Sequence, residues 1–131
     1  MKKGFKDNIE KLTEENNNFR KVLYTGENSQ LVLMSLGPNE DIGAEIHDEN
    51  DQFFRFEKGK GKVVINETEY EVEDGDAVVV PKGARHNVIA GDEGLKMYTI
   101  YSPAHHKDGI VRETKNEAEQ NEADFDGVTT E

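Results

Sequence analysis

Three polar side chains of unlike chemistry fall in one short stretch of this sequence, at positions where strand geometry would turn them toward one side. Glu45 and His47 are two residues apart, so an extended strand projects both from the same face. Residues 48–51 form a polar turn sequence, and Gln52 follows them. If the resulting hairpin sets Gln52 beside His47, a carboxylate, an imidazole and an amide converge. Burying such groups costs free energy unless a partner satisfies them, and a divalent metal ion would be such a partner.

A second imidazole follows a fixed turn farther along the chain. Residues 77–80 are typical of a buried strand, which Pro81 ends, and Gly83 permits a tight turn. His86 then opens the next strand, so this turn would hold it rigidly at the mouth of a barrel. Two imidazoles, one carboxylate and one amide oxygen make a mixed nitrogen and oxygen ligand set. Such a set suits one divalent first-row transition metal, such as Mn, Fe, Co, Ni or Zn.

The elements that must position these side chains are predicted to be short strands. From residue 19 onward, runs rich in Val, Ile, Phe and Tyr alternate with turn sequences, and strand starts recur every roughly 8–12 residues. This spacing is typical of an all-β sandwich or barrel, and no run at helical period interrupts it before residue 102. We expect strands over residues 19–25, 31–36, 43–47, 52–59, 61–66, 68–73, 77–81, 86–90 and 95–101.

Strand alternation also predicts which side chains line the barrel. Phe54 and Phe56 share the face of Gln52, and Thr99 and Tyr101 point inward if Lys96 points outward. Four of these inward side chains form a candidate substrate pocket: Phe54, Phe56, Thr99 and Tyr101. His105 and His106 lie beyond the last strand, where a solvated loop pair is the simplest interpretation and a cap over the pocket mouth is the alternative.

Length and composition bound the remaining possibilities. The chain has 131 residues, which fits one domain, and a formal net charge of −12 disfavours nucleic acid and anionic membranes as partners. It has no cysteine, so disulfides and a cysteine nucleophile are excluded. The first residues carry two lysines but no apolar run behind them, which argues against a signal peptide. We therefore expect a cytoplasmic protein that binds a small molecule.

Both ends of the chain differ from the β-rich middle. Residues 1–18 are polar and predict a short amphipathic or irregular lead-in, followed by a barrel domain over 19–112. Residues 113–131 carry seven acidic side chains against one lysine, which predicts a disordered, solvated tail. The alternative is a short helix over 113–122 that docks on a partner subunit.

Two segments resemble the two motifs of the cupin superfamily, which are small β-barrels of the jelly-roll type. The first motif, G-x5-H-x-H-x3,4-E-x6-G, is similar to the stretch that contains His47 and ends at Gly59, although Asn39 stands at its opening glycine. The second motif, G-x5-P-x-G-x2-H-x3-N, matches at Gly75, Pro81, Gly83 and His86, with Ala90 at the final position. The resemblance covers residues 30–101 and implies a single cupin jelly-roll barrel, similar to phosphomannose isomerase-like cupins.

The departures from these motifs alter the ligand set that the resemblance implies. Cupins commonly bind a metal through three histidines and a glutamate, and here Glu45 replaces the first histidine and Gln52 replaces the glutamate. The matched positions become Glu45, His47, Gln52 and His86. One carboxylate remains in the set. Glu45 is then either a metal ligand or a free general base beside a metal held by the other three.

Three functions are compatible with this sequence. The first is a metal-dependent, isomerase-like enzyme acting on a small polar substrate such as a sugar or a keto acid. The second is an Fe(II)-dependent dioxygenase, and the third is a non-catalytic binding module. Many cupins pair through their sheets, and outward Phe53 together with the aliphatic stretch at residues 31–36 predicts a homodimer.

Overall fold

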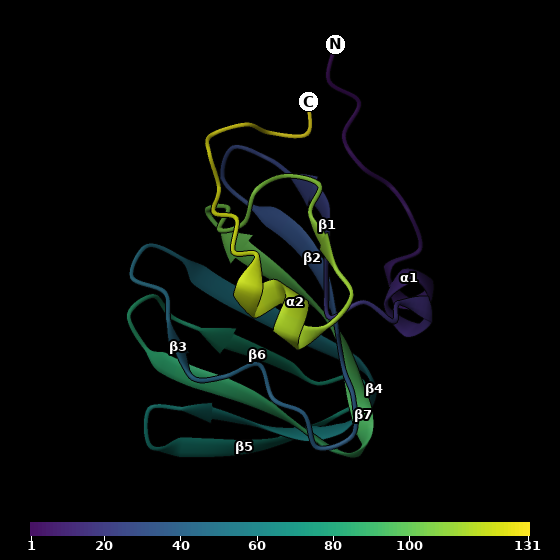
Figure 1. Ribbon diagram of the computed structural model, residues 1–131, viewed down its shortest axis with the longest axis vertical. Helices are drawn as coiled ribbons and strands as arrows, with labels where there is room; N and C mark the ends of the chain where they lie inside the picture. Colours follow the sequence, from purple (N-terminus) through teal and green to yellow (C-terminus); the bar gives the residue numbers. More distant parts are fainter.

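The computed structural model describes residues 1–131, and its strands form one antiparallel sheet that curls into a jelly-roll barrel (Figure 1). Along the sheet the order is β5–β4–β7–β2–β1–β8, while β3 pairs with β7 and β6 pairs with β4. The all-β class predicted from the strand spacing is confirmed. In chain order the elements are α1 (Ile9–Glu15), β1 (Arg20–Thr25), β2 (Gln30–Leu36), β3 (Glu45–Ile46), β4 (Asp51–Ile65), β5 (Thr68–Glu73), β6 (Ala77–Val80), β7 (Arg85–Ser102), β8 (Val111–Arg112) and α2 (Lys115–Gln120).

Two long strands, β4 and β7, form the centre of the sheet and correspond to four of the predicted strands. They pair along both of their halves, with register shifts where the pair bends near Gly59. Gly59 has φ +99°, and a Cβ atom there would collide with the carbonyl oxygen of Gly94. The last glycine of the first motif is therefore required by the close approach of two backbones at this bend.

The barrel interior is built from the alternate residues that the sequence pattern assigned to it. Phe54 and Phe56 are fully buried, as are Met97 and Thr99, and Tyr101 is 2% exposed. The residues that alternate with them, Phe53 and Arg55 on β4 and Tyr98 and Ile100 on β7, are only partly buried. The inward orientation predicted for these side chains is confirmed, and it leaves the polar groups of β4 and β7 facing the inside of the barrel.

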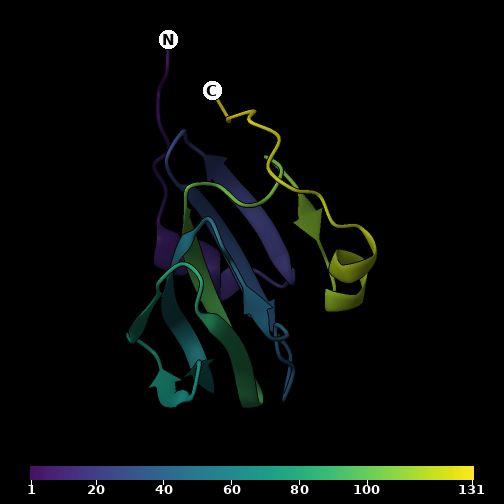
Figure 2. The ribbon, with the colours of Figure 1, turned by 90° about the vertical axis from the view of Figure 1, so that its left-hand side faces the viewer.

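The two helices lie on opposite sides of the strands, and the chain ends lie close together (Figure 2). Helix α1 packs on the outer surface of β7, where Lys96 donates a hydrogen bond to the carbonyl of Asn16. Glu131 accepts hydrogen bonds from the backbone amides of Lys3 and Gly4, at 2.6 and 2.8 Å. Neither helix is long and apolar enough to cross a membrane.

The C-terminal residues differ from the disordered tail that their composition predicts. Helix α2 docks on its own chain, and Ala118 is 3% exposed. Lys115 Nζ lies 2.7 Å from Asp41 Oδ1, and backbone hydrogen bonds join residues 123–125 to residues 105–107. Polar contacts with the barrel therefore hold a segment whose own apolar surface is small.

Candidate metal centre

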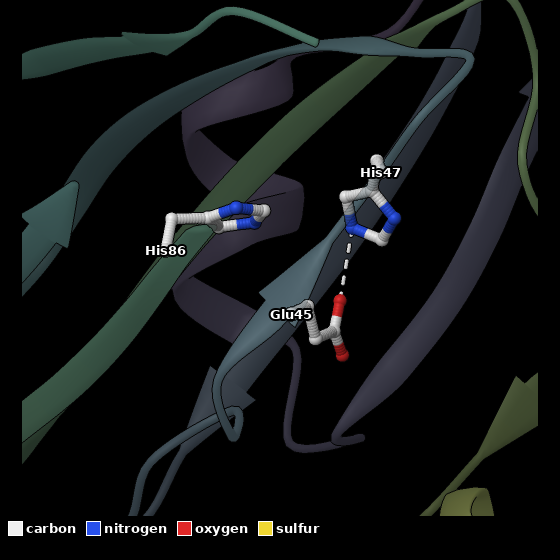
Figure 3. Close-up of side chains that lie close together, drawn as sticks. All are labelled: Glu45, His47 and His86. Atoms are coloured by element: carbon white, nitrogen blue, oxygen red, sulfur yellow. Dashed lines mark ion pairs between the residues drawn. The ribbon is translucent and has the colours of Figure 1, made fainter. Parts of the chain in front are cut away.

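Glu45, His47 and His86 form a cluster at one end of the barrel, and we call these three residues the metal cluster (Figure 3). One ligand atom from each of the three lies within 4.8 Å of the others. The expected hairpin between residues 43–47 and 52–59 is not what assembles them. Strand β3 pairs with β7 instead, and Glu45 lies directly opposite His86 in that register. The cluster therefore depends on a pairing between residues far apart in the sequence.

Backbone contacts of the second motif hold the two histidines of the metal cluster in place. Gly83, which has φ +84°, donates its N–H to the carbonyl of His47 at 2.9 Å. His86 Nδ1 lies 3.1 Å from the carbonyl oxygen of Ala84. Because a carbonyl can only accept, Nδ1 carries the proton and Nε2 presents a lone pair to the cluster. Burial lowers the pKa of His86, which also favours the neutral form that a metal needs.

His47 and Glu45 face one another without forming a well-directed hydrogen bond. His47 Nε2 lies 2.9 Å from Glu45 Oε2, yet Nε2 is buried with no hydrogen-bond partner. Two atoms that bind one ion side by side at ~2.1 Å each would be about 3 Å apart, so this contact fits a shared metal. Burial would raise the pKa of Glu45, but His47 and Arg20 outweigh burial and lower it. The carboxylate is therefore ionised near neutral pH.

Gln52 lies on the inner face of β4 with half of its amide unsatisfied. It is 2% exposed, and its Nε2 donates to Thr99 Oγ1 at 3.0 Å. Its Oε1 is buried and has no hydrogen-bond partner. A buried oxygen without a hydrogen-bond partner costs free energy unless something binds it. An amide oxygen can coordinate a divalent metal ion. The donor chemistry thus fits a first-row metal, while the coordination of Gln52 itself stays a prediction.

A cavity of about 360 Å³ adjoins the metal cluster, and Glu45 and His47 form part of its wall. His105 and His106 also line it, so the simpler expectation of a solvated loop pair is wrong. His106 is 7% exposed, and the rings of His105 and His47 have centroids 4.4 Å apart. Residues 105–107 and 113–125 together enclose the outer side of this cavity, and we call them the cover.

Sequence reasoning missed Gln30, which fixes the histidines of the cover. Its side-chain oxygen accepts the N–H groups of His105 and His106 at 3.2 and 3.0 Å, and its amide donates to the carbonyl of His106 at 2.7 Å. Arg20 lines the same cavity and was also missed. For the cover, the one sequence signal of a place near the site was position, since His105 and His106 follow closely after the strand that carries Tyr101.

The four residues predicted to form a substrate pocket lie deeper than this cavity. All are at most 2% exposed inside the barrel, and none lines the cavity wall. They support the site by packing, since the Phe54 ring lies against His86 and the Tyr101 ring lies against His47. Direct contact of these four with a substrate stays a prediction.

A jelly-roll barrel with a cluster of histidine and carboxylate ligands at one end is the class of protein that this fold and site define. The family model described as "Cupin domain" matches residues 32–101, so the chain belongs to the cupin family. The resemblance drawn from the two motifs is thereby confirmed. The comparison with phosphomannose isomerase-like cupins in particular stays a prediction.

Three proteins illustrate what the chain is similar to. It is 47% identical over 123 residues to YrkC of Bacillus subtilis, covering 88% of this chain and 66% of that protein. It is 42% identical to L612 of Acanthamoeba polyphaga mimivirus, covering 79% of this chain and 68% of that protein. The crystal structure of BH2720 from Bacillus halodurans superposes with a TM-score of 0.89 at 42% identity, covering 91% of this chain and 96% of that one. None of these three names states an activity.

Proposed function

We propose that this chain is a metal-dependent enzyme, isomerase-like, that acts on a small polar substrate such as a sugar or a keto acid. The observation that carries this proposal is the convergence of Glu45, His47 and His86 beside a cavity of about 360 Å³. A structural metal site would be closed, whereas this cluster faces a space large enough for a small molecule. The specific reaction is inferred from the chemistry that such a site supports.

Each residue of the site has a distinct part in this proposal. His47 and His86 would hold the ion through their Nε2 atoms, and Gln52 Oε1 would complete the inner side. The ion would supply Lewis acidity that polarises a carbonyl or hydroxyl oxygen of the substrate. Glu45, whose side chain is 33% exposed, faces the cavity in its ionised form. It either joins the ligands or accepts a proton from a substrate carbon.

The test begins with elemental analysis of protein purified without chelator or metal-affinity resin. We expect near one equivalent of a first-row metal in the parent and none in the His47→Ala/His86→Ala double variant. Glu49→Gln is the matched control for Glu45→Gln, because Glu49 is an exposed carboxylate outside the cluster. Turnover of aldose–ketose pairs under nitrogen, lost in Glu45→Gln and kept in Glu49→Gln, would support the isomerase proposal. Negligible metal in the parent after incubation with Mn, Fe, Ni and Zn would contradict the proposal of a metal-dependent enzyme.

A dioxygenase is the second candidate, and the composition of the metal cluster favours it. Two histidines and one carboxylate are the ligand types of the facial triad in non-haem Fe(II) oxygenases. Iron retained from cells together with substrate-dependent oxygen consumption would select this function over the isomerase. Thermal stabilisation by ligands, with no turnover in either assay, would indicate a binding module instead.

A homodimer is part of the same proposal, and the outer face of the sheet supports it. Strand register places Val79, Phe53, Ile100 and Leu31 in one row across four strands, and Val79 is 62% exposed. We expect light scattering to give about twice the 14.8 kDa chain mass for the parent and one chain mass for Val79→Glu. Tyr70→Glu is the control, since Tyr70 is 49% exposed on β5 outside this row. A monomeric parent at micromolar concentration would contradict the proposed homodimer.

A further inference from the structure

Arg20 lies at the start of β1 in the wall of the cavity, and its guanidinium has no partner within the protein. Its Nε is buried without a hydrogen bond, and no carboxylate oxygen lies within 4.0 Å of its nitrogens. The chain has 28 acidic residues against 16 basic ones, so carboxylates are abundant. A charged group that is partly removed from water and left unpaired costs free energy unless a ligand completes it.

The other cations near the cavity are already engaged. Lys115 is paired with Asp41, and Arg112 donates to the carbonyl of Asn121 at 2.8 Å. Arg20 and Arg112 lie directly opposite each other in the pairing of β1 with β8. Like charges at opposed positions are destabilising, so this arrangement adds a further cost to Arg20. Its only ring contact is with its neighbour Phe19, at 5.4 Å, which does not offset a missing anion.

Arg20 shares its cavity with a residue of the metal cluster and with a residue of the cover. Arg20, Glu45 and His106 all line one cavity. An anion placed at the guanidinium would therefore lie in the same space as the candidate metal ligands.

We infer that Arg20 is the anchor for the carboxylate of a small monocarboxylate substrate, which the metal cluster contacts at its other polar end. This inference rests on the proposed function and narrows its substrate class to keto acids, hydroxy acids and sugar acids. The planar guanidinium presents two parallel N–H groups that match a carboxylate. A cavity of about 360 Å³ holds a molecule of that size.

The charge of the cover limits the ligand to one negative group. Glu119, Glu122 and Asp124 line the outer wall of the cavity, and only Arg20 offers an unpaired cation there. A dianion such as inorganic phosphate would meet repulsion from these carboxylates that a monocarboxylate anchored at Arg20 feels less. We therefore expect pyruvate and lactate to bind, and phosphate to bind more weakly.

Calorimetry on the full chain, after metal loading, tests this inference. The probes are pyruvate, lactate, inorganic phosphate and hydroxyacetone, which is a neutral analogue of pyruvate. We expect Arg20→Gln to weaken pyruvate binding at least tenfold, with hydroxyacetone binding and metal content unchanged. The pyruvate affinity of Arg20→Lys should lie between those of the parent and Arg20→Gln, because lysine keeps the charge but loses the paired N–H groups. Lys21→Gln is the control, since it removes the same charge from an exposed neighbour.

The outcomes separate this inference from the proposed function. Equal pyruvate affinity in the parent and Arg20→Gln, or a parent that binds neither pyruvate nor lactate, would overturn the role of Arg20 even where metal is bound. Phosphate binding as tight as pyruvate would overturn the restriction to one charge. A parent that takes up no metal but binds pyruvate in an Arg20-dependent way would keep the anchor and remove the metalloenzyme.

Discussion

The metal cluster and the cover face each other across one cavity but are built by different means. Glu45 and His86 are placed by strand register, and His47 is held by the amide of Gly83. The cover depends on side-chain contacts, such as those of Gln30 with the two histidines, and on a short helix with one buried alanine. The inner side should therefore resist perturbation, while the outer side should open at a lower free energy.

If the proposed function holds, this contrast places the chemistry on one side of the cavity and the selectivity on the other. Under the proposed function, the metal cluster would hold the groups that polarise the substrate or move protons, and the residues around the cover would decide the charge and size of what enters. Arg20 belongs to neither cupin motif, and neither do His105 and His106. Members of this family that share the cluster are therefore expected to differ at these outer positions.

The largest effect should follow from breaking the metal cluster itself. We expect His86→Ala to abolish metal retention, because it removes a preoriented Nε2 lone pair from the site. Gln52→Leu should weaken metal affinity by a smaller factor, on the order of 10–100-fold, if its orphaned oxygen completes the site. Competition with a chromophoric chelator measures both variants. Parent-like affinity in Gln52→Leu would show that the site consists of the metal cluster alone.

A second large effect is expected in the cover, without loss of the metal. Ala118→Glu places a charge where the native side chain is 3% exposed, so α2 should undock rather than bury it. Hydrogen exchange should then accelerate over residues 113–125, while the amides of β4 and β7 stay protected. Gln120→Glu adds the same charge at an exposed position of the same helix and should change neither. Accelerated exchange throughout the barrel would contradict the separation of the two sides.

Much of the inner side could be predicted from sequence because it obeys local rules. Alternation placed Phe54, Phe56 and Tyr101 inside, and the turn at Gly83 placed His86 at the head of its strand. What local rules do not contain is the partner of each strand. The chain reversal after His47 predicted a hairpin, but β3 pairs with β7, and only that long-range choice puts Glu45 opposite His86.

The cover was harder to predict because its stabilisation is hardly visible in composition. Seven acidic residues in 113–131 indicate solvation, yet backbone hydrogen bonds to residues 105–107 form regardless of side-chain type. His105 and His106 follow a proline and an alanine in a sequence typical of a loop. Their burial depends on Gln30, which lies about 75 residues earlier in the chain.

Stability against acid should show a moderate effect from His106. Burial first, and then Arg20, Arg112, His105 and His47 around it, lower the pKa of His106 to about 2. In the unfolded chain the pKa is about 6.5, so the unfolded state binds the extra proton below that pH. The free energy of unfolding should therefore fall as pH drops through 6.5. Between pH 7.5 and 5.5 the parent should lose about 1.4 kcal/mol more than His106→Gln.

Urea unfolding at the two pH values measures that difference. The pKa values of His86 and His105 are also lowered by burial, but these residues are present in both proteins and their contribution cancels. Equal losses in the parent and His106→Gln would mean that His106 is not held neutral in the folded protein. The outer side of the cavity would then be wetter than its burial indicates.

The smallest effect should come from the ion pair that ties the cover to the barrel. Lys115 Nζ and Asp41 Oδ1 are 2.7 Å apart, but Asp41 is 39% exposed, so water and salt screen the pair. We expect Lys115→Met to lower the free energy of unfolding by about 0.5 kcal/mol or less, and this difference should vanish in 1 M NaCl. The pKa of Asp41, which Lys115 and Asn87 lower, should rise in the variant, as NMR titration would show. A loss above about 1 kcal/mol would mean that the cover is coupled to the barrel more tightly than its exposed contacts allow.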